Sequence, residues 1–89
     1  MGSGEQSWPE WWSWELELTP HVLKRMEDRD FNEVDLRQML EHTLRYRPDA
    51  VDGRGVIDVR HGRRRWEIIV EPDDIEHLLV VVTAYPITR

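Results

Sequence analysis

The sequence contains no cysteine, only one lysine and no long apolar run. Without cysteine, neither disulfides nor thiolate metal sites can hold the fold. A small chain of this kind that also lacks a charged-then-apolar leader is typical of an intracellular protein. The longest apolar run, LLVVV at Leu78 to Val82, is far too short to cross a bilayer. We therefore predict a cytoplasmic protein with no membrane association.

Several chemical motifs are also missing. The sequence has no glycine-rich loop of the kind that cradles phosphates and no pattern typical of a nucleophile triad. The adjacent Asp73 and Asp74 are explained by a turn. The histidines do not have the spacing of a metal site; they are His21, His42, His61 and His77. We expect neither a metal nor another cofactor.

The length of 89 residues is enough for one domain with a modest core and too short for two. The first residues, MGSGEQS, are small and polar, as in many flexible chain ends. We predict a flexible N-terminus over residues 1–10 and a single domain over residues 11–89.

The net charge is −6, but the charges are unevenly distributed. Residues 1–44 hold ten acids and four bases, residues 45–65 hold seven arginines and three aspartates, and residues 66–89 hold five acids and one arginine. The middle segment is therefore basic between two acidic segments. Two interpretations remain open for it: a patch that binds phosphate, or a solvated arginine-rich hairpin.

The N-terminal part of the domain combines a strand pattern with two helix starts. From Trp12 to Leu18 apolar and polar residues alternate, which predicts a half-buried strand. Thr19 is a good N-cap and Pro20 suits the first helical position, which predicts a helix over residues 20–29. Asn32, followed by acids in the next turn, predicts a second helix over residues 32–44.

The C-terminal half predicts three strands joined by short turns, over Val56 to Arg60, Arg65 to Glu71 and Leu78 to Tyr85. Strands that are joined by short turns usually pair with each other in antiparallel orientation. The predicted fold is an α+β domain in which two N-terminal helices pack on one face of a four-stranded antiparallel sheet, in the order strand, helix, helix, strand, strand, strand. The apolar phases predict a core of Leu23, Met26, Val34, Leu36, Leu40, Ile68, Val70, Val80 and Val82.

Three stretches of the chain resemble a known family. TPHVLKRMEDRDF, GRRRWEIIVEPD and LLVVVTAYP resemble the family catalogued as domain of unknown function 4258, which is similar to the RelE and BrnT type toxins of bacterial toxin–antitoxin systems. The resemblance covers nearly everything from Glu17 to Pro86. It implies a RelE-like fold with the same order of elements, cleavage of messenger RNA, and an antitoxin protein as partner.

The chain also contains the residue types that metal-free RNA cleavage requires, namely a base for the ribose 2′-hydroxyl, cations for the phosphate and an acid for the leaving oxygen. His21 is the candidate base because it begins a helix one turn before Arg25. Thr83 lies two residues before Tyr85, the candidate acid, on the same strand face, and we expect it to orient the phenol. The predicted catalytic residues are His21, Arg25, Arg65 and Tyr85, and the predicted substrate-binding residues are Arg60, Arg63, Arg64 and Thr83.

Each of these residues also has a structural interpretation. Arg25 and Asp28, or Arg29 and Glu33, can form surface ion pairs on neighbouring helical turns, and a tyrosine in an apolar strand is often a core residue. The alternative function is a non-catalytic interaction module of the same fold. Aromatic residues near the N-terminus favour a partner protein or a homodimer there; they are Trp8, Trp11, Trp12 and Trp14.

Overall fold

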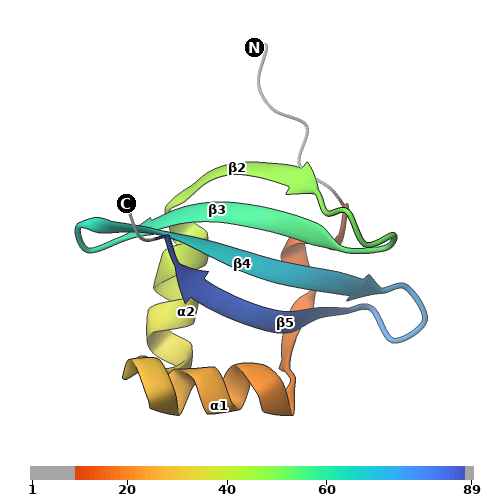
Figure 1. Ribbon diagram of the computed structural model, residues 1–89. Coiled ribbons are helices and arrows are strands. Elements are labelled where there is room, and N and C mark those ends of the chain that lie inside the picture. The colour runs from red at the N-terminus through yellow and green to blue at the C-terminus, as the bar shows by residue number, and fades with distance from the viewer. Residues whose placement is uncertain (1–9, 88–89) are drawn as a thin grey trace.

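The computed structural model describes residues 10–87. A short 3-10 helix, η1, precedes two α-helices and five strands (Figure 1). The elements are η1 (Glu10–Ser13), β1 (Glu15–Leu18), α1 (Pro20–Arg29), α2 (Glu33–Glu41), β2 (Thr43–Pro48), β3 (Gly55–His61), β4 (Arg64–Asp73) and β5 (Leu78–Pro86). The flexibility predicted for residues 1–10 falls on a segment that lies almost entirely outside the described residues.

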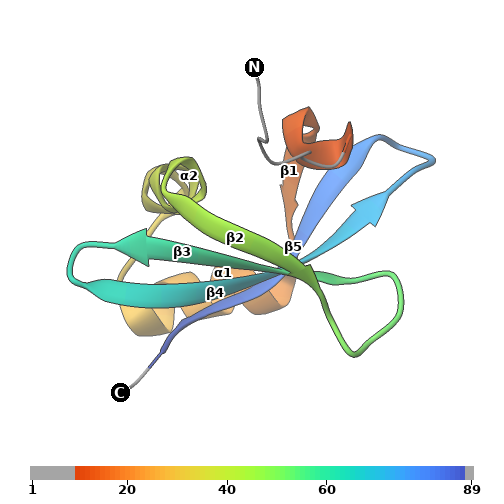
Figure 2. The same cartoon turned by 90° about the horizontal axis from the view of Figure 1, so that it is seen from above.

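The sheet has the strand order β1-β5-β4-β3-β2, and both α-helices cover the same face of it (Figures 1 and 2). The predicted α+β class is confirmed. The prediction of four antiparallel strands is wrong, because the sheet has five strands and β1 runs parallel to β5. Alternation predicted a strand before α1, but the direction in which that strand pairs depends on a partner more than sixty residues away in the chain.

The predicted second helix ends earlier than expected, and a strand follows it directly. The backbone N–H of His42 donates to the carbonyl of Met39, and the hydroxyl of Thr43 donates to the carbonyl of Leu40. These bonds close the last turn of α2, and the chain then enters β2. Residues 43 and 44, predicted as helix, belong to this strand, which pairs antiparallel with β3.

Both predicted helix caps are present. The side chain of Thr19 accepts a hydrogen bond from the backbone N–H of Val22, and its hydroxyl is shared between the carbonyls of Val81 and Val82 on β5. The cap therefore also ties the start of α1 to the sheet. Asn32 and Asp35 form a reciprocal capping box at the start of α2.

The core lies between the helices and the sheet. Leu36 is fully buried there, as predicted, but Leu23 and Val34 are 47% and 63% exposed. Val22 and Met26, four residues apart, form the buried stripe of α1 instead. The other buried members of this core are Phe31, Met39, Ile57, Val59, Trp66, Ile68, Val70, Leu79, Val81 and Ala84, whereas Leu40, Val80 and Val82 are only partly buried.

A bulge in β5 explains why Val80 and Val82, which were predicted to lie in the core, are only partly buried. Ile69 of β4 pairs with Thr83, but the next residue, Val70, pairs with Val81, so Val82 is an extra residue in β5. On the N-terminal side of this bulge Val81 faces the helices. Beyond the bulge the side chains are shifted by one position, which places Thr83 and Tyr85 on the sheet face without helices, here called the open face.

We predict that Leu36→Ala lowers the free energy of unfolding by about 2–5 kcal/mol, because it leaves a cavity at a fully buried position. Val34→Ala on the same helix is the matched control and should change it by less than about 0.5 kcal/mol, because Val34 is mostly exposed. Urea denaturation of the two variants measures both values. Equal losses would contradict the observed orientation of α2.

Candidate functional site

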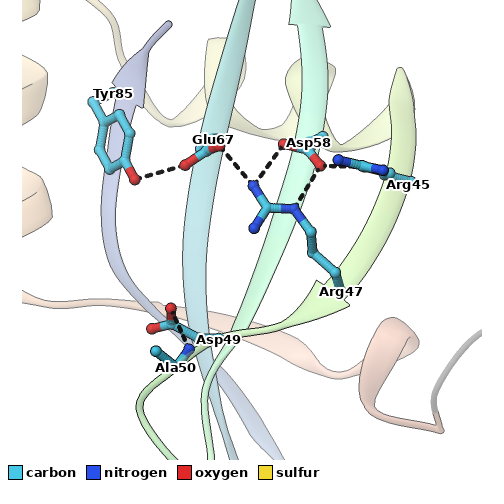
Figure 3. Close-up of polar contacts among 7 residues, drawn as sticks. All are labelled: Arg45, Arg47, Asp49, Ala50, Asp58, Glu67 and Tyr85. Atoms are coloured by element: carbon cyan, nitrogen blue, oxygen red, sulfur yellow. Dashed lines mark hydrogen bonds and ion pairs between the residues drawn. The ribbon is translucent and has the colours of Figure 1, made fainter.

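A row of polar side chains crosses the open face of the sheet (Figure 3). Arg45 of β2, Asp58 of β3, Glu67 of β4 and Tyr85 of β5 are direct neighbours in successive strand pairs. Arg47, two residues along β2, reaches into the same row. The register of four strands therefore brings together residues that are far apart in the sequence.

Continuous hydrogen bonds join the members of this row. Nε of Arg45 lies 2.9 Å from Oδ2 of Asp58, and Nε of Arg47 lies 3.2 Å from the same oxygen. Nη2 of Arg47 also donates to Oε2 of Glu67 at 2.7 Å. The hydroxyl of Tyr85 donates to Oε1 of Glu67 at 2.7 Å. Arg47 thus links the two carboxylates, and Glu67 links the arginine to the phenol.

Asp58 is the buried charge of the row, with only 5% of its surface exposed. Burial on its own raises the pKa of this carboxyl, but the hydrogen bonds from Arg47 and Arg45 outweigh that effect and the pKa lies below its ordinary value. The hydrogen bond to Asp58 in turn raises the pKa of Arg47, against the opposing effect of burial. Asp58 is consequently ionised and fully paired at neutral pH.

Tyr85 is held in its neutral form. Its hydrogen bond to Glu67, together with burial, raises the pKa of the phenol to about 12. A phenolate next to the Glu67 carboxylate would place two negative charges side by side. At neutral pH the pair therefore consists of a neutral hydroxyl donor and a carboxylate acceptor.

The row borders a hollow of about 390 Å³, here called the open-face hollow. Its walls contain three guanidinium groups against two carboxylates, so its net charge is positive. The lining residues are Arg45, Arg47, Asp58, Arg65, Glu67 and Ile87. The hollow is therefore suited to an anionic ligand.

The arginines at the β3–β4 end of the sheet differ from those of the row. Arg60 and Arg65 are direct neighbours across the two strands, and such like-charged neighbours destabilise a sheet. Gly62, with φ of 64°, makes the tight turn that places Arg63 and Arg64 beside them. Among residues 10–87, no carboxylate forms an ion pair with any of these four arginines, whereas Arg37, Arg45 and Arg54 each pair with one carboxylate and Arg47 pairs with two.

The predicted site residues divide between two sides of the sheet. Tyr85 and Thr83 lie on the open face, and Arg65 lines the open-face hollow. His21 and Arg25 belong to α1, which packs on the other face, so the sheet separates them from Tyr85. The expectation of one site containing all of these residues is therefore wrong. A base near a helix start was inferred from local sequence, and the side of the sheet to which that helix packs is a tertiary property.

Thr83 does not orient Tyr85 as the sequence suggested. Its hydroxyl oxygen is buried and has no hydrogen-bond partner among the described residues. The tyrosine is oriented by Glu67 instead.

The surface ion pairs considered for α1 are also absent. Asp28 lies 3.5 Å from Lys24, and Glu33 bonds Arg37. Neither acid is paired with Arg25 or Arg29 in the part of the chain that the structure describes.

Sequence reasoning missed Arg45, Arg47, Asp58 and Glu67. Two signals for them were present. In the stretch TLRYRP two arginines alternate with Leu44, Tyr46 and Pro48, which is the period of a strand. Asp58 is the single acid within the apolar stretch VIDV, and an acid in a buried strand requires a cationic partner.

Two of the N-terminal tryptophans pack against their own chain. Trp11 contacts the ring of Tyr46 edge-on, with centroids 5.2 Å apart, and Trp14 stacks on His77 at 4.9 Å. Trp8 lies outside the described residues. A homodimer through this segment stays a prediction.

No family model, curated protein or solved structure matches the chain. Within residues 10–87 no helix is long and apolar enough to span a membrane, and no group of three or more potential metal-ligating side chains is placed to hold an ion.

We predict that Asp58→Asn lowers the free energy of unfolding by about 1–3 kcal/mol near neutral pH, because Arg45 and Arg47 lose their charged partner. A carboxyl whose pKa is depressed by folding contributes stability above its unfolded pKa, and this contribution is lost as the pH falls through the folded value. The wild type should therefore lose more stability than the variant on acidification below about pH 4. Urea denaturation across that range measures the difference.

Asp52→Asn is the matched control, because Asp52 is an exposed loop residue. Its stability should follow the wild-type pH dependence. Parallel curves for Asp58→Asn and the wild type would contradict the assigned role of the buried carboxylate.

Proposed function

We propose that the chain is a RelE-like, metal-independent RNA endonuclease of the cytoplasm that cleaves messenger RNA on the open face of its sheet. The observation that supports this best is that Arg60 and Arg65, which have no ion-pair partner among the described residues, lie on the open face beside a hydroxyl–carboxylate pair, Tyr85 and Glu67. Cations that hold a phosphate and a proton acceptor for a ribose hydroxyl are the two requirements of the reaction. A protein antitoxin as partner belongs to the same proposal.

Arg65 holds the phosphate that reacts. It lines the open-face hollow and lies two residues before Glu67 on the same face of β4, which is about 7 Å along the strand. Its guanidinium has no acid partner in the described part of the chain, so it is available for phosphate oxygens, which match the guanidinium fork. Arg45 also lines the hollow and adds a second charge.

Tyr85 and Glu67 together act as the base. In the proposed step the phenol oxygen takes the proton of the ribose 2′-hydroxyl while the phenol passes its own proton to Glu67. The 2′-oxygen forms a bond to phosphorus, the bond from phosphorus to the 5′-oxygen of the next nucleotide breaks, and that oxygen takes a proton from solvent. The products are a 2′,3′-cyclic phosphate and a 5′-hydroxyl end, and Glu67 then returns its proton to solvent.

Arg47 positions this pair. Its Nη2 holds the second oxygen of Glu67, and its Nε is fixed by Asp58. The carboxylate is thereby aimed at the Tyr85 hydroxyl before substrate binds. Preorganisation of this kind lowers the barrier because no group has to turn during the reaction. The proposal assigns no role to His21, which lies on α1 across the sheet.

The overall negative charge is compatible with RNA binding because the charges are segregated. The segment 45–65 is basic, and four of its arginines lie at one end of the sheet without an ion-pair partner in the described part of the chain. A polyanion binds to such a local patch through release of its counterions. Binding should consequently weaken as salt concentration rises.

The test is cleavage of a messenger RNA fragment in the absence of divalent metal, with the 3′-ends of the products analysed for cyclic phosphate. We predict that Tyr85→Phe lowers the rate constant by about 10²–10⁴-fold, because the relay loses its hydroxyl. Glu67→Gln should cause a similar loss, and Arg65→Ala should weaken both RNA binding and turnover. The fold should remain intact in Tyr85→Phe, which removes one oxygen atom.

Arg37→Ala is the matched control. This arginine is exposed, is paired with Glu33 on α2 and lies away from the open face, so its loss should leave cleavage unchanged. Full activity in Tyr85→Phe would overturn the proposed mechanism. RNA binding without any cleavage by the wild type would overturn the nuclease assignment and favour a non-catalytic module of the same fold.

A further inference from the structure

A second hollow lies where α2 ends beside β3. Its volume is about 290 Å³, and it is lined by Gln38, His42, Arg60, His61 and Gly62. None of these residues is acidic. We refer to it as the His42 hollow.

The hydrogen bonds of His42 determine which of its nitrogens can meet a ligand. Nδ1 lies 2.9 Å from the carbonyl oxygen of Gln38, and a carbonyl only accepts. Nδ1 therefore carries a hydrogen and is occupied. Nε2 is the nitrogen that remains for a ligand, as an acceptor in the neutral ring and as a donor in the protonated one.

Most of the carbonyl groups at the C-terminal end of α2, beside the His42 hollow, are hydrogen-bonded and so repel an anion less than free carbonyl groups would. A helix C-terminus normally presents unpaired carbonyl groups, which repel negative charge. Here the carbonyl of Gln38 is bound by the His42 ring, that of Met39 by the His42 backbone, and that of Leu40 by the Thr43 hydroxyl. These bonds occupy three of the last four carbonyl oxygens of α2 and so reduce the repulsion that a phosphate would meet there.

The walls of the His42 hollow are held in place. The backbone N–H of Arg60 donates to the carbonyl of His42 at 3.3 Å, which joins β3 to the end of α2. The ring of His61 contacts Trp66 edge-on, with centroids 6.2 Å apart. Trp66 is buried in the core, so it gives that ring a fixed neighbour.

The charge around the hollow selects an anion over a metal ion. Two imidazoles alone are a small ligand set, and no third His, Asp or Glu completes a cluster there among residues 10–87. Arg60 forms part of the wall, and Arg63 and Arg64 follow in the adjoining turn. A cation would be repelled by these three charges, whereas a phosphate would be attracted.

We infer that the His42 hollow is a second phosphate subsite, which holds a backbone phosphate of the RNA next to the one that reacts at Arg65. This inference rests on the proposed function. Arg60 lines the His42 hollow and Arg65 lines the open-face hollow, and the two arginines are direct neighbours across β3 and β4. β2 pairs with β3 only as far as Val59, so Arg60 and His61 lie at a free edge of the sheet, around which an RNA strand passes from the open-face hollow to the His42 hollow. Binding of RNA phosphates to Arg60 and Arg65 then compensates for the repulsion between these two arginines, which destabilises the sheet.

The histidines of the chain provide an internal control for the test. Inorganic phosphate, and then a 2′-O-methyl RNA oligonucleotide that cannot be cleaved, is titrated into the full chain labelled with ¹⁵N at the histidine rings. The ring signals of His42 and His61 should shift, whereas His21 on α1 and His77 before β5 should not. Equal shifts at all four rings, or none at His42 and His61, would overturn the inference.

Substitution of Arg60 tests whether the hollow binds a phosphate of RNA or free phosphate. Arg60→Gln should weaken binding of the oligonucleotide by about tenfold, as expected for loss of a charge-assisted contact. Shortening the oligonucleotide by one phosphate should weaken wild-type binding similarly and have little further effect on Arg60→Gln. If inorganic phosphate shifts the His42 and His61 signals but binding does not depend on the length of the oligonucleotide in this way, the RNA subsite is overturned and the hollow is a site for free phosphate only.

The two proposals fail in different ways. Tyr85→Phe should leave the phosphate-induced shifts of the His42 and His61 signals unchanged, because the phenol is not part of the His42 hollow. Absence of cleavage by a wild type whose His42 and His61 signals respond to RNA would overturn the nuclease assignment alone. Cleavage by a wild type whose signals do not respond would overturn the second subsite alone.

Discussion

The open face of this protein depends on one buried carboxylate. Asp58 on β3 is 5% exposed, and a charge at such a buried position is tolerated only when it is paired. Its partners, Arg45 and Arg47, both come from the edge strand β2. The need to neutralise Asp58 therefore fixes β2 against β3, and Arg47 extends the same network to Glu67 and Tyr85.

The two faces of the sheet are stabilised by different interactions. Burial of apolar side chains beneath α1 and α2 organises the helix face, and hydrogen-bonded charges organise the open face. The bulge at Val82 connects the two, because it keeps Val81 and Ala84 in the core while it turns Tyr85 toward Glu67. A regular strand could not satisfy both faces over its whole length.

The arginines fall into groups with different consequences. Arg45, Arg47 and Arg54 are bound to carboxylates on the sheet and contribute to its structure. The four arginines at the β3–β4 end have no such partners in the described part of the chain and repel one another. A concentration of unpaired charge is better explained by a ligand than by stability. This contrast separates the proposed binding surface from the structural network beside it.

The sequence by itself determined the parts of the fold that depend on neighbouring residues. Thr19 and Asn32 marked both helix starts, and alternation with short turns marked β3, β4 and β5, because caps, turns and strand periods act over a few residues. Tertiary structure decided the rest: that β1 joins β5 in parallel, that Thr43–Pro48 pairs with β3 at the edge of the sheet, and that His21 and Tyr85 lie on opposite sides of the sheet. The pairing of Asp58 and the bulge at Val82 were decided in the same way. Each of these features depends on contacts between residues distant in the chain, which local patterns do not encode.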